Sequence, residues 1–246
     1  MNLKLRYIAI ICAFFGPLII CSAQINSISI NTGLGPANST IQVHDTALDK
    51  TELYLNKSNL KPSVFTINLL TDVGLTKKKH FFFQTGLNYS AFGKGDPFIR
   101  DVYQEANGAS RLVSYRQDYS WFGLPLNFGY HLNKGVIKPY ISTGLNLSYF
   151  LDRSVIKENY YVYDANNNLT AFGQSSLVLN RRNLQLWNTL TIGADCQAFR
   201  FSQLGVTVQA QFANQLTSVW SSMIDEKIMY FTFSFGIKYW LEKPTN

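Results

Sequence analysis

The chain has 246 residues, a formal net charge of +7 and only 15% charged residues, against the roughly 25% that is usual for soluble domains. After residue 23 there is no run of about 18 consecutive apolar residues, which excludes a helical membrane protein. The basic residues form no cluster interleaved with exposed aromatics, apart from Lys77-Lys78-Lys79 in a predicted tight turn. A nucleic-acid partner is therefore excluded as well.

The first 23 residues are predicted to be a secretory signal peptide. Lys4 and Arg6 precede the apolar run Ile8–Ile20, and the small residues Cys21 and Ala23 fit a signal cleavage site. An N-terminal membrane anchor and lipoprotein processing at Cys21 are the alternatives. Cleavage after Ala23 would remove two cations and no acid, so the formal charge would fall from +7 to 20 − 15 = +5.

The rest of the chain, residues 24–246, repeats one pattern in which apolar residues alternate with small or polar ones. Since side chains alternate across a strand with a period of two, each copy predicts a strand with one apolar face. About eight strands are expected, and together they form one domain. In chain order they cover Ile25–Leu34, Phe65–Val73, Phe81–Tyr89, Phe122–Tyr130, Val136–Phe150, Leu184–Ala194, Leu204–Phe212 and Phe231–Tyr239.

The connections between these strands alternate strictly between short and long. This alternation predicts an up-and-down antiparallel barrel, with short periplasmic turns at one end and long extracellular loops at the other. Pro125 and Pro139 lie inside predicted strands, where they indicate bulges or twists, with a local break in pairing as the alternative. The short turns are Thr76–Lys79, Asn133–Gly135 and Arg200–Ser202, and the long loops are Gly35–Pro62, Lys94–Arg111, Asp152–Arg181 and Gln215–Glu226.

The polar face of the predicted strands carries Ser, Thr, Asn, Gln, Gly and Tyr, and eleven of the 15 acidic residues fall in the long loops. Such a face suits a packed, hydrogen-bonded interior, so the apolar face is expected to meet lipid. The fold class is therefore an all-β, single transmembrane β-barrel in the outer membrane. A soluble lipocalin-like binder is the alternative, with its apolar face inside the barrel.

Aromatic residues near both ends of the predicted strands are expected to form two girdles at the headgroup level. The alternative is that they are ordinary core aromatics of a β protein. The girdle beside the short turns would contain Phe81, Phe82, Tyr130, Tyr239 and Trp240, and the girdle toward the long loops Tyr89, Trp121, Phe122, Tyr149, Phe150 and Tyr230.

An eight-stranded barrel is narrow enough for side chains to fill it, so a diffusive pore is not expected. The strand pattern places Asp72, Lys138, Asp195 and Lys238 on the inward face near the short turns. We expect them to form a structural interior charge cluster, with Lys138 and Asp195 on neighbouring strands. A proton or ion path is the alternative function of this cluster.

No catalytic, metal or cofactor site is predicted. His44, beside Asp45 and near Ser39, is the one histidine on the long-loop side, and an outer-leaflet lipid-modifying enzyme would need a His-Ser-acid set there. Cys196 would be the one cysteine of the mature chain, which excludes an intramolecular disulfide and a cysteine metal site. The expected partners are outer-membrane lipid and, at the loop Tyr160–Asn168, a protein or glycan, and the chain is expected to be a monomer.

One stretch of the sequence resembles a known family. Asp118–Leu132, the turn Asn133-Lys134-Gly135 and the strand Val136–Leu145, with Lys138-Pro139-Tyr140, resemble the PorT-like outer-membrane β-barrel family of the Gram-negative Bacteroidetes. The resemblance covers essentially Gln24–Leu241. It implies a structural or interactive role, with an accessory role in protein secretion as the alternative. The tail after Trp240 departs from the many barrels that end on an aromatic residue.

Overall fold

The computed structural model describes residues 24–43, 62–75, 80–95, 101–104, 110–132, 135–151, 156–177, 183–197, 203–217 and 224–241. The predicted signal peptide lies outside these residues. No helix in the described part of the chain is long and apolar enough to cross a membrane. The strands are β1 (Gln24–Val43), β2 (Ser63–Gly74), β3 (Phe81–Gly95), β4 (Asp101–Gln104), β5 (Ser110–His131), β6 (Ile137–Phe150), β7 (Ile156–Tyr163), β8 (Leu169–Leu177), β9 (Leu184–Gln197), β10 (Leu204–Gln215) and β11 (Ile224–Trp240).

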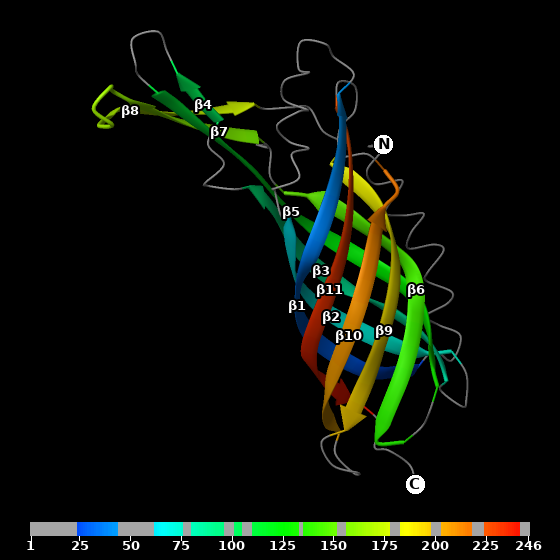
Figure 1. The fold of residues 1–246 in the computed structure, drawn as a ribbon. Coiled ribbons are helices and arrows are strands. Elements are labelled where there is room, and N and C mark those ends of the chain that lie inside the picture. Colours follow the sequence, from blue (N-terminus) through cyan, green and yellow to red (C-terminus); the bar gives the residue numbers. More distant parts are fainter. Residues whose placement is uncertain are drawn as a thin grey trace.

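Eight of these strands close into one antiparallel barrel. They pair in the order β3-β2-β1-β11-β10-β9-β6-β5, and a further pairing between β3 and β5 closes the ring. Figure 1 shows the strongly tilted strands of this wall. The eight predicted segments match these eight strands in chain order, so the predicted barrel is confirmed. Closure leaves no free strand edge in the wall, which is what a sheet needs in lipid.

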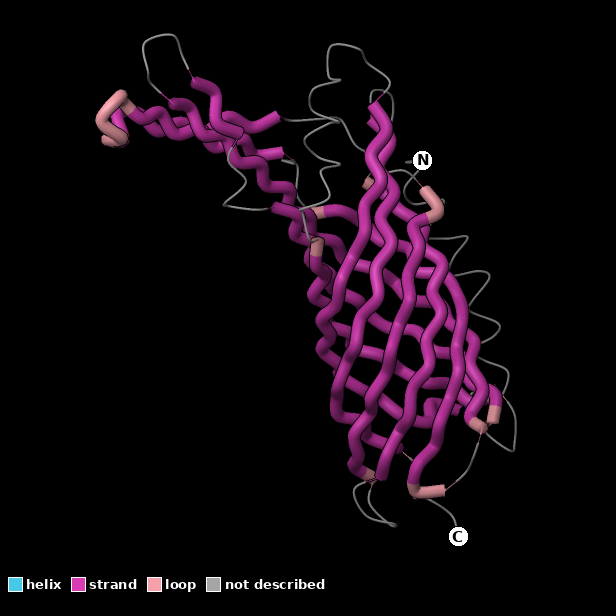
Figure 2. The backbone as a smooth tube through the Cα atoms, in the orientation of Figure 1, coloured by secondary structure: helices cyan, strands magenta, loops and turns pink. Residues whose placement is uncertain are grey.

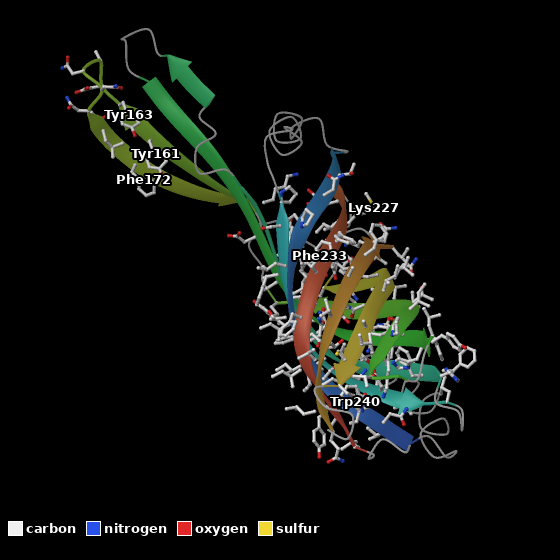
Figure 3. All side chains as sticks on the ribbon, turned by 60° about the horizontal axis from the view of Figure 1, so that its bottom comes forward. Tyr161, Tyr163, Phe172, Lys227, Phe233 and Trp240 are labelled. Carbon is white, nitrogen blue, oxygen red and sulfur yellow. The ribbon has the colours of Figure 1, made fainter. Side chains whose placement is uncertain are left out.

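Side chains alternate between the outside and the inside of the barrel as the period-two pattern predicted. Leu34 and Phe233 are each 64% exposed on the outer surface, whereas the inward-facing Asp195 and Lys238 are 0% and 4% exposed. Figure 3 shows Phe233 on the outside of the wall. A soluble lipocalin-like barrel would have the opposite arrangement, with polar residues outside. The apolar outer surface therefore fits a bilayer and not water.

Pro125 marks a local break in the barrel wall. The ladder between β3 and β5 pairs Thr85 with Leu126 and then resumes with Asn88 and Gly123, without a change of register. A proline has no N–H to donate to a neighbouring strand, so the ladder loses a bond at this position. The structure supports the alternative prediction for Pro125, a local break in pairing, and Gly86, with a positive φ, lies opposite Pro125 in this interrupted part of the ladder.

Two of the connections that were predicted as loops contain strands, and this prediction was wrong. β4 lies within the predicted loop Lys94–Arg111, and β7 and β8 lie within Asp152–Arg181. The first half of β5 pairs with β4 and with β7, and β7 pairs with β8, so these strands extend the barrel sheet beyond the wall. Figures 1 and 2 show this extension projecting away from the long-loop end of the barrel. We call it the projecting sheet.

Candidate functional site

The barrel interior holds a charge cluster near the short-turn end. Lys238 on β11 places its Nζ 2.5 Å from Oδ2 of Asp72 on β2 and 2.5 Å from Oδ2 of Asp195 on β9. Asp72 also accepts hydrogen bonds from Ser27 Oγ at 3.0 Å and from Gln84 Nε2 at 2.9 Å. The lysine thus connects two strands that lie apart in the barrel wall. Charged groups can be buried in this way because each is paired with an opposite charge and the carboxylates accept further hydrogen bonds.

The fourth predicted member, Lys138, lies opposite Asp195 in the ladder between β6 and β9. Its Nζ lies 5.0 Å from the ring centroid of Trp240, a distance at which the ammonium group is attracted to the ring face. The structure thus brings Asp72, Asp195 and Lys238 into direct contact and places Lys138 at the edge of the same region. The three residues in direct contact come from three strands, β2, β9 and β11.

Two further residues of the cluster were missed by the sequence analysis. His131 lies with its Nε2 3.3 Å from Oδ2 of Asp195, and Tyr140 donates a hydrogen bond from its hydroxyl to Oε1 of Gln209 at 2.8 Å. Lys238 Nζ also lies 5.9 Å from the centroid of the Tyr140 ring. The signal was present in the sequence, since the period-two pattern of β5 and β6 places His131 and Tyr140 on the inward face.

Between the charge cluster and the long-loop end, further side chains fill the inside of the barrel. Asn88 donates from Nδ2 to Oδ1 of Asn68 at 2.5 Å, and Thr189 donates from Oγ1 to Oδ1 of Asn127 at 2.9 Å. Toward the long-loop end, the indole rings of Trp121 and Trp187 stack with centroids 5.2 Å apart, and both side chains are fully buried. A barrel of eight strands is just wide enough to be filled in this way.

A residue of an aromatic girdle must face outward, and only some of the predicted girdle residues do. Phe81, Phe122, Tyr149 and Tyr239 are exposed on the outer surface, and Tyr89 and Tyr130 are partly exposed. The error has a simple cause: the prediction paired sequence neighbours, such as Phe81 with Phe82, whereas neighbours in a strand face opposite sides of the sheet. The residues that point into the bore instead are Phe82, Trp121, Phe150, Tyr230 and Trp240.

Toward the long-loop end, the inside of the barrel holds a second group of buried polar side chains. Tyr119 donates a hydrogen bond from its hydroxyl to Oε2 of Glu226 at 2.6 Å, and Lys94 donates from Nζ to Oγ of Ser39 at 2.8 Å. All four side chains are buried. His44 and Asp45, which the lipid-modifying alternative requires, lie outside the described residues. In the described part of the chain, no group of three or more His, Cys, Asp or Glu side chains is arranged to hold a metal ion.

The predicted interaction loop Tyr160–Asn168 is only partly a loop: Tyr160–Tyr163 belong to β7, and residues 164–168 form the turn between β7 and β8 at the tip of a hairpin in the projecting sheet. Asp164 accepts hydrogen bonds from the N–H groups of Asn166 at 2.9 Å and of Asn168 at 2.8 Å, and from Nδ2 of Asn168 at 3.1 Å. The bonds from Asn168, which favour the ionised carboxylate, lower the pKa of Asp164 below its ordinary value. The rings of Tyr161 and Phe172 lie 5.0 Å apart on the two strands, and Phe172 is exposed.

These features define the class of the protein. A closed eight-stranded barrel with an apolar outer surface and a filled, polar bore is a transmembrane β-barrel of the outer-membrane type. No protein-family model matches the chain, and no curated protein matches it. The resemblance to the PorT-like family therefore stays a prediction.

Among solved structures, the chain is similar to several small outer-membrane barrels. Neisserial surface protein A is 10% identical with a TM-score of 0.47, and the match covers 89% of this chain and 98% of that one. OprG from Pseudomonas aeruginosa is 9% identical with a TM-score of 0.41, covering 89% and 97%. The outer membrane enzyme PagL is 10% identical with a TM-score of 0.37, covering 85% and 97%. At these values the similarity assigns neither a family nor a function.

Proposed function

We propose that this protein is an outer-membrane anchor that holds the projecting sheet at the cell surface, where the sheet contacts another molecule. One observation carries the proposal: β5 is a single strand, Ser110–His131, that belongs to both parts. Its second half pairs with β3 and β6 in the barrel wall, and its first half pairs with β4 and β7 in the projecting sheet. The sheet is therefore fixed to the membrane through an uninterrupted backbone.

The orientation that we propose follows from the connections. Export through a signal peptide and insertion from the periplasm favour short periplasmic turns, with the long connections and the projecting sheet outside the cell. In this orientation the buried charge cluster lies toward the periplasm and the stacked Trp121 and Trp187 toward the outside. Because side chains fill the bore at several levels, we propose that the barrel does not conduct solutes.

Surface labelling tests this proposal. A Cys196→Ser background removes the one cysteine of the mature chain, and single cysteines are then introduced at Asn166, in the hairpin tip, and at Val136, beside a short turn. Both positions are exposed. A membrane-impermeant maleimide added to intact cells should label Asn166→Cys and leave Val136→Cys unlabelled until the cells are opened. The reverse pattern, or equal labelling of both, would contradict the display of the projecting sheet.

A second measurement tests the filled bore. The purified chain in a planar lipid bilayer should show no ion conductance above that of the bilayer alone, because the Trp121–Trp187 stack and the charge cluster both obstruct the bore. Stable open-channel steps would contradict this part of the proposal while leaving surface display untouched.

An accessory role in protein secretion is the second candidate. It is supported by the segment Asp118–Leu145, which carries the resemblance to PorT-like proteins and forms much of β5 and β6. Co-purification of the membrane-embedded chain with secretion proteins would favour this role. Their absence, together with a surface-bound partner, would favour the anchor.

A further inference from the structure

The second group of buried polar side chains, toward the long-loop end, contains a serine hydroxyl bonded directly to a lysine amine. Lys94 Nζ on β3 lies 2.8 Å from Ser39 Oγ on β1, although the two residues are 55 positions apart in the chain. Behind the lysine, Glu226 interacts electrostatically with Lys94 and accepts a hydrogen bond from the Tyr119 hydroxyl at 2.6 Å. A hydroxyl, an amine and a carboxylate in this order form the arrangement of a nucleophile, a base and a group that orients the base.

Burial across this group increases from the serine to the acid. The exposed fraction falls from 8% at Ser39 to 4% at Lys94, 1% at Tyr119 and 0% at Glu226. The serine is therefore the member nearest to the protein surface, and the amine lies behind it. A structural ion pair does not require this order, whereas a nucleophile must be the member that a substrate meets first.

The serine and the lysine meet where one wall strand has ended. β1 pairs with β2 as far as the pair of Pro36 with Ser63, and β3 pairs with β2 as far as the pair of Gly93 with Ser63. Ser39 and Lys94 lie beyond these pairs, so in the described part of the chain no strand separates β1 from β3 at their level. We call this interruption of the wall the notch. The β2 backbone therefore does not stand between Ser39 and the surroundings of the barrel there.

The notch lies beyond the apolar outer surface of the barrel. On the outward face beside Ser39, Thr40 pairs with Lys227, and both side chains are exposed. Figure 3 shows Lys227 at this end of β11. On β5, Asp118 lies opposite Gly93 and is partly exposed. Because charged side chains on the lipid face are costly in the hydrocarbon core, this level corresponds to the headgroup region.

Burial favours the neutral form of the Lys94 amine. The pKa of Lys94 is lowered because burial disfavours the ammonium form, and this effect outweighs the opposing effect of the Glu226 carboxylate. A neutral amine can accept the hydroxyl proton of Ser39 over the same 2.8 Å. Lysines whose pKa falls on burial serve as general bases.

We propose that Ser39 and Lys94 are a nucleophile and its general base, and that they hydrolyse a carboxylic ester of a membrane amphiphile in the leaflet beside the long-loop end. Ser39 Oγ forms a bond to the ester carbonyl carbon while its proton passes to the Lys94 amine. The bond from that carbon to the alcohol oxygen then breaks, and the alcohol leaves with the proton from Lys94. Water releases the acid from Ser39 by the same two steps, so one ester and one water give one acid and one alcohol.

The position of the pair selects this class of substrate. The notch interrupts the wall in the headgroup region, where the ester groups of membrane amphiphiles meet water, so such a substrate reaches Ser39 from the bilayer itself. The proposal goes beyond the anchor role and does not depend on it, because Ser39 and Lys94 lie on wall strands and not in the projecting sheet.

A serine-directed probe tests the nucleophile. The full chain in lipid nanodiscs is treated with a biotin-linked fluorophosphonate, whose phosphorus bonds to an activated serine oxygen as fluoride leaves. Mass spectrometry should find the adduct on Ser39. Thr40→Ala, which changes the exposed neighbour, should be modified at the wild-type rate, and Ser39→Ala should not be modified. Absence of the adduct from wild-type chain that migrates as the folded, unboiled band would overturn the proposal.

Substitution of the lysine separates a general base from a structural partner. Lys94→Arg keeps a cation that can donate to Ser39, but an arginine cannot be deprotonated in proteins. We therefore expect the rate of modification to fall by about 100-fold or more in Lys94→Arg, while the unboiled band is retained. In the wild type the rate should rise with pH through the lowered pKa of Lys94 and level off before the ordinary pKa of lysine is reached. An unchanged rate in Lys94→Arg, or a rate independent of pH, would overturn the role of the base.

Two esters with the same leaving group test the substrate class. In nanodiscs, p-nitrophenyl decanoate enters the bilayer, whereas p-nitrophenyl acetate stays in water. The kcat/KM of the wild type should be about tenfold or more higher for the decanoate, since its longer chain favours the bilayer, and both activities should be lost in Ser39→Ala. Equal values for the two esters would overturn the assignment of a membrane amphiphile. Hydrolysis that persists in Ser39→Ala, or none in the wild type, would overturn the assignment of Ser39.

Discussion

Replacing Lys238 with Met tests whether the interior charge cluster supports the barrel. Met keeps an unbranched, apolar stem of similar length and removes the ammonium group, which leaves Asp72 and Asp195 buried without their shared cation. Each Oδ2 lies 2.5 Å from Nζ, so the two carboxylate oxygens are at most about 5 Å apart. At an effective dielectric of about 20, two negative charges at that distance repel by roughly 3 kcal/mol or more.

This magnitude agrees with the loss expected when one partner of a buried ion pair is removed, about 3–5 kcal/mol. We therefore expect Lys238→Met to lower the free energy of unfolding in lipid vesicles by about 3–5 kcal/mol. The assay is urea unfolding followed by the loss of the fast-migrating, unboiled band on a gel. The slope of the transition should stay unchanged, because the barrel buries the same surface.

A charge-matched variant provides the control. Combining Lys238→Met with Asp72→Asn and Asp195→Asn removes both carboxylates, so most of the lost stability should return. An unfolding midpoint for Lys238→Met equal to the wild-type value would refute the reasoning. So would an equal loss in the single and the triple variant, because the loss would then come from packing and not from charge.

Three further predictions concern the bore and the hairpin. Gly129→Ala should destabilise the barrel by about 1–3 kcal/mol, because its Cβ would collide with the Phe82 ring, whereas Gly93→Ala, with 3.5 Å to Asp118 Oδ1, should be tolerated in the same unfolding assay. Trp187→Ala should cost about 3–5 kcal/mol in that assay, since the indole is fully buried, and a smaller loss than for a lipid-facing Phe128→Ala would contradict its core role. The pKa of Asp164 is lowered, so the hydrogen bonds from Asn166 and Asn168 to its carboxylate are fully formed above the ordinary pKa of an aspartate. They are lost as the pH falls through the lowered pKa of Asp164. Backbone NMR shifts of Asn168 should report this change in the wild type and stay constant in Asp164→Asn.

The barrel wall could be predicted from the sequence because each of its strands carries its own period-two pattern. That pattern requires no knowledge of distant residues, and it placed Asp72, Asp195 and Lys238 on the inward face. The contacts between them could not be predicted in the same way. Lys238 and Asp72 are 166 positions apart, and which inward side chains meet depends on the stagger of all the strands between them.

The girdle error and the missed strands have different physical causes. Trp121 and Trp240 were placed in the girdles by their position along the strand, although their neighbours Phe122 and Tyr239 already occupied the outward face. β7 and β8 were missed because their strands lie beyond the apolar outer band of the barrel and lack its alternation. Their pairing depends on β5 continuing past the barrel, which no local pattern in Ile156–Leu177 reveals.

The barrel wall and the projecting sheet differ in their strand edges, because the wall is a closed ring and the projecting sheet is open. In the wall, the pairing of β3 with β5 closes the ring, so no strand has an unpaired edge and lipid contacts only side chains. In the projecting sheet, β5 leaves the ring and its pairing partners end at β4 and β8. A strand long enough to serve both structures, such as β5, places an open edge at a fixed position relative to the membrane.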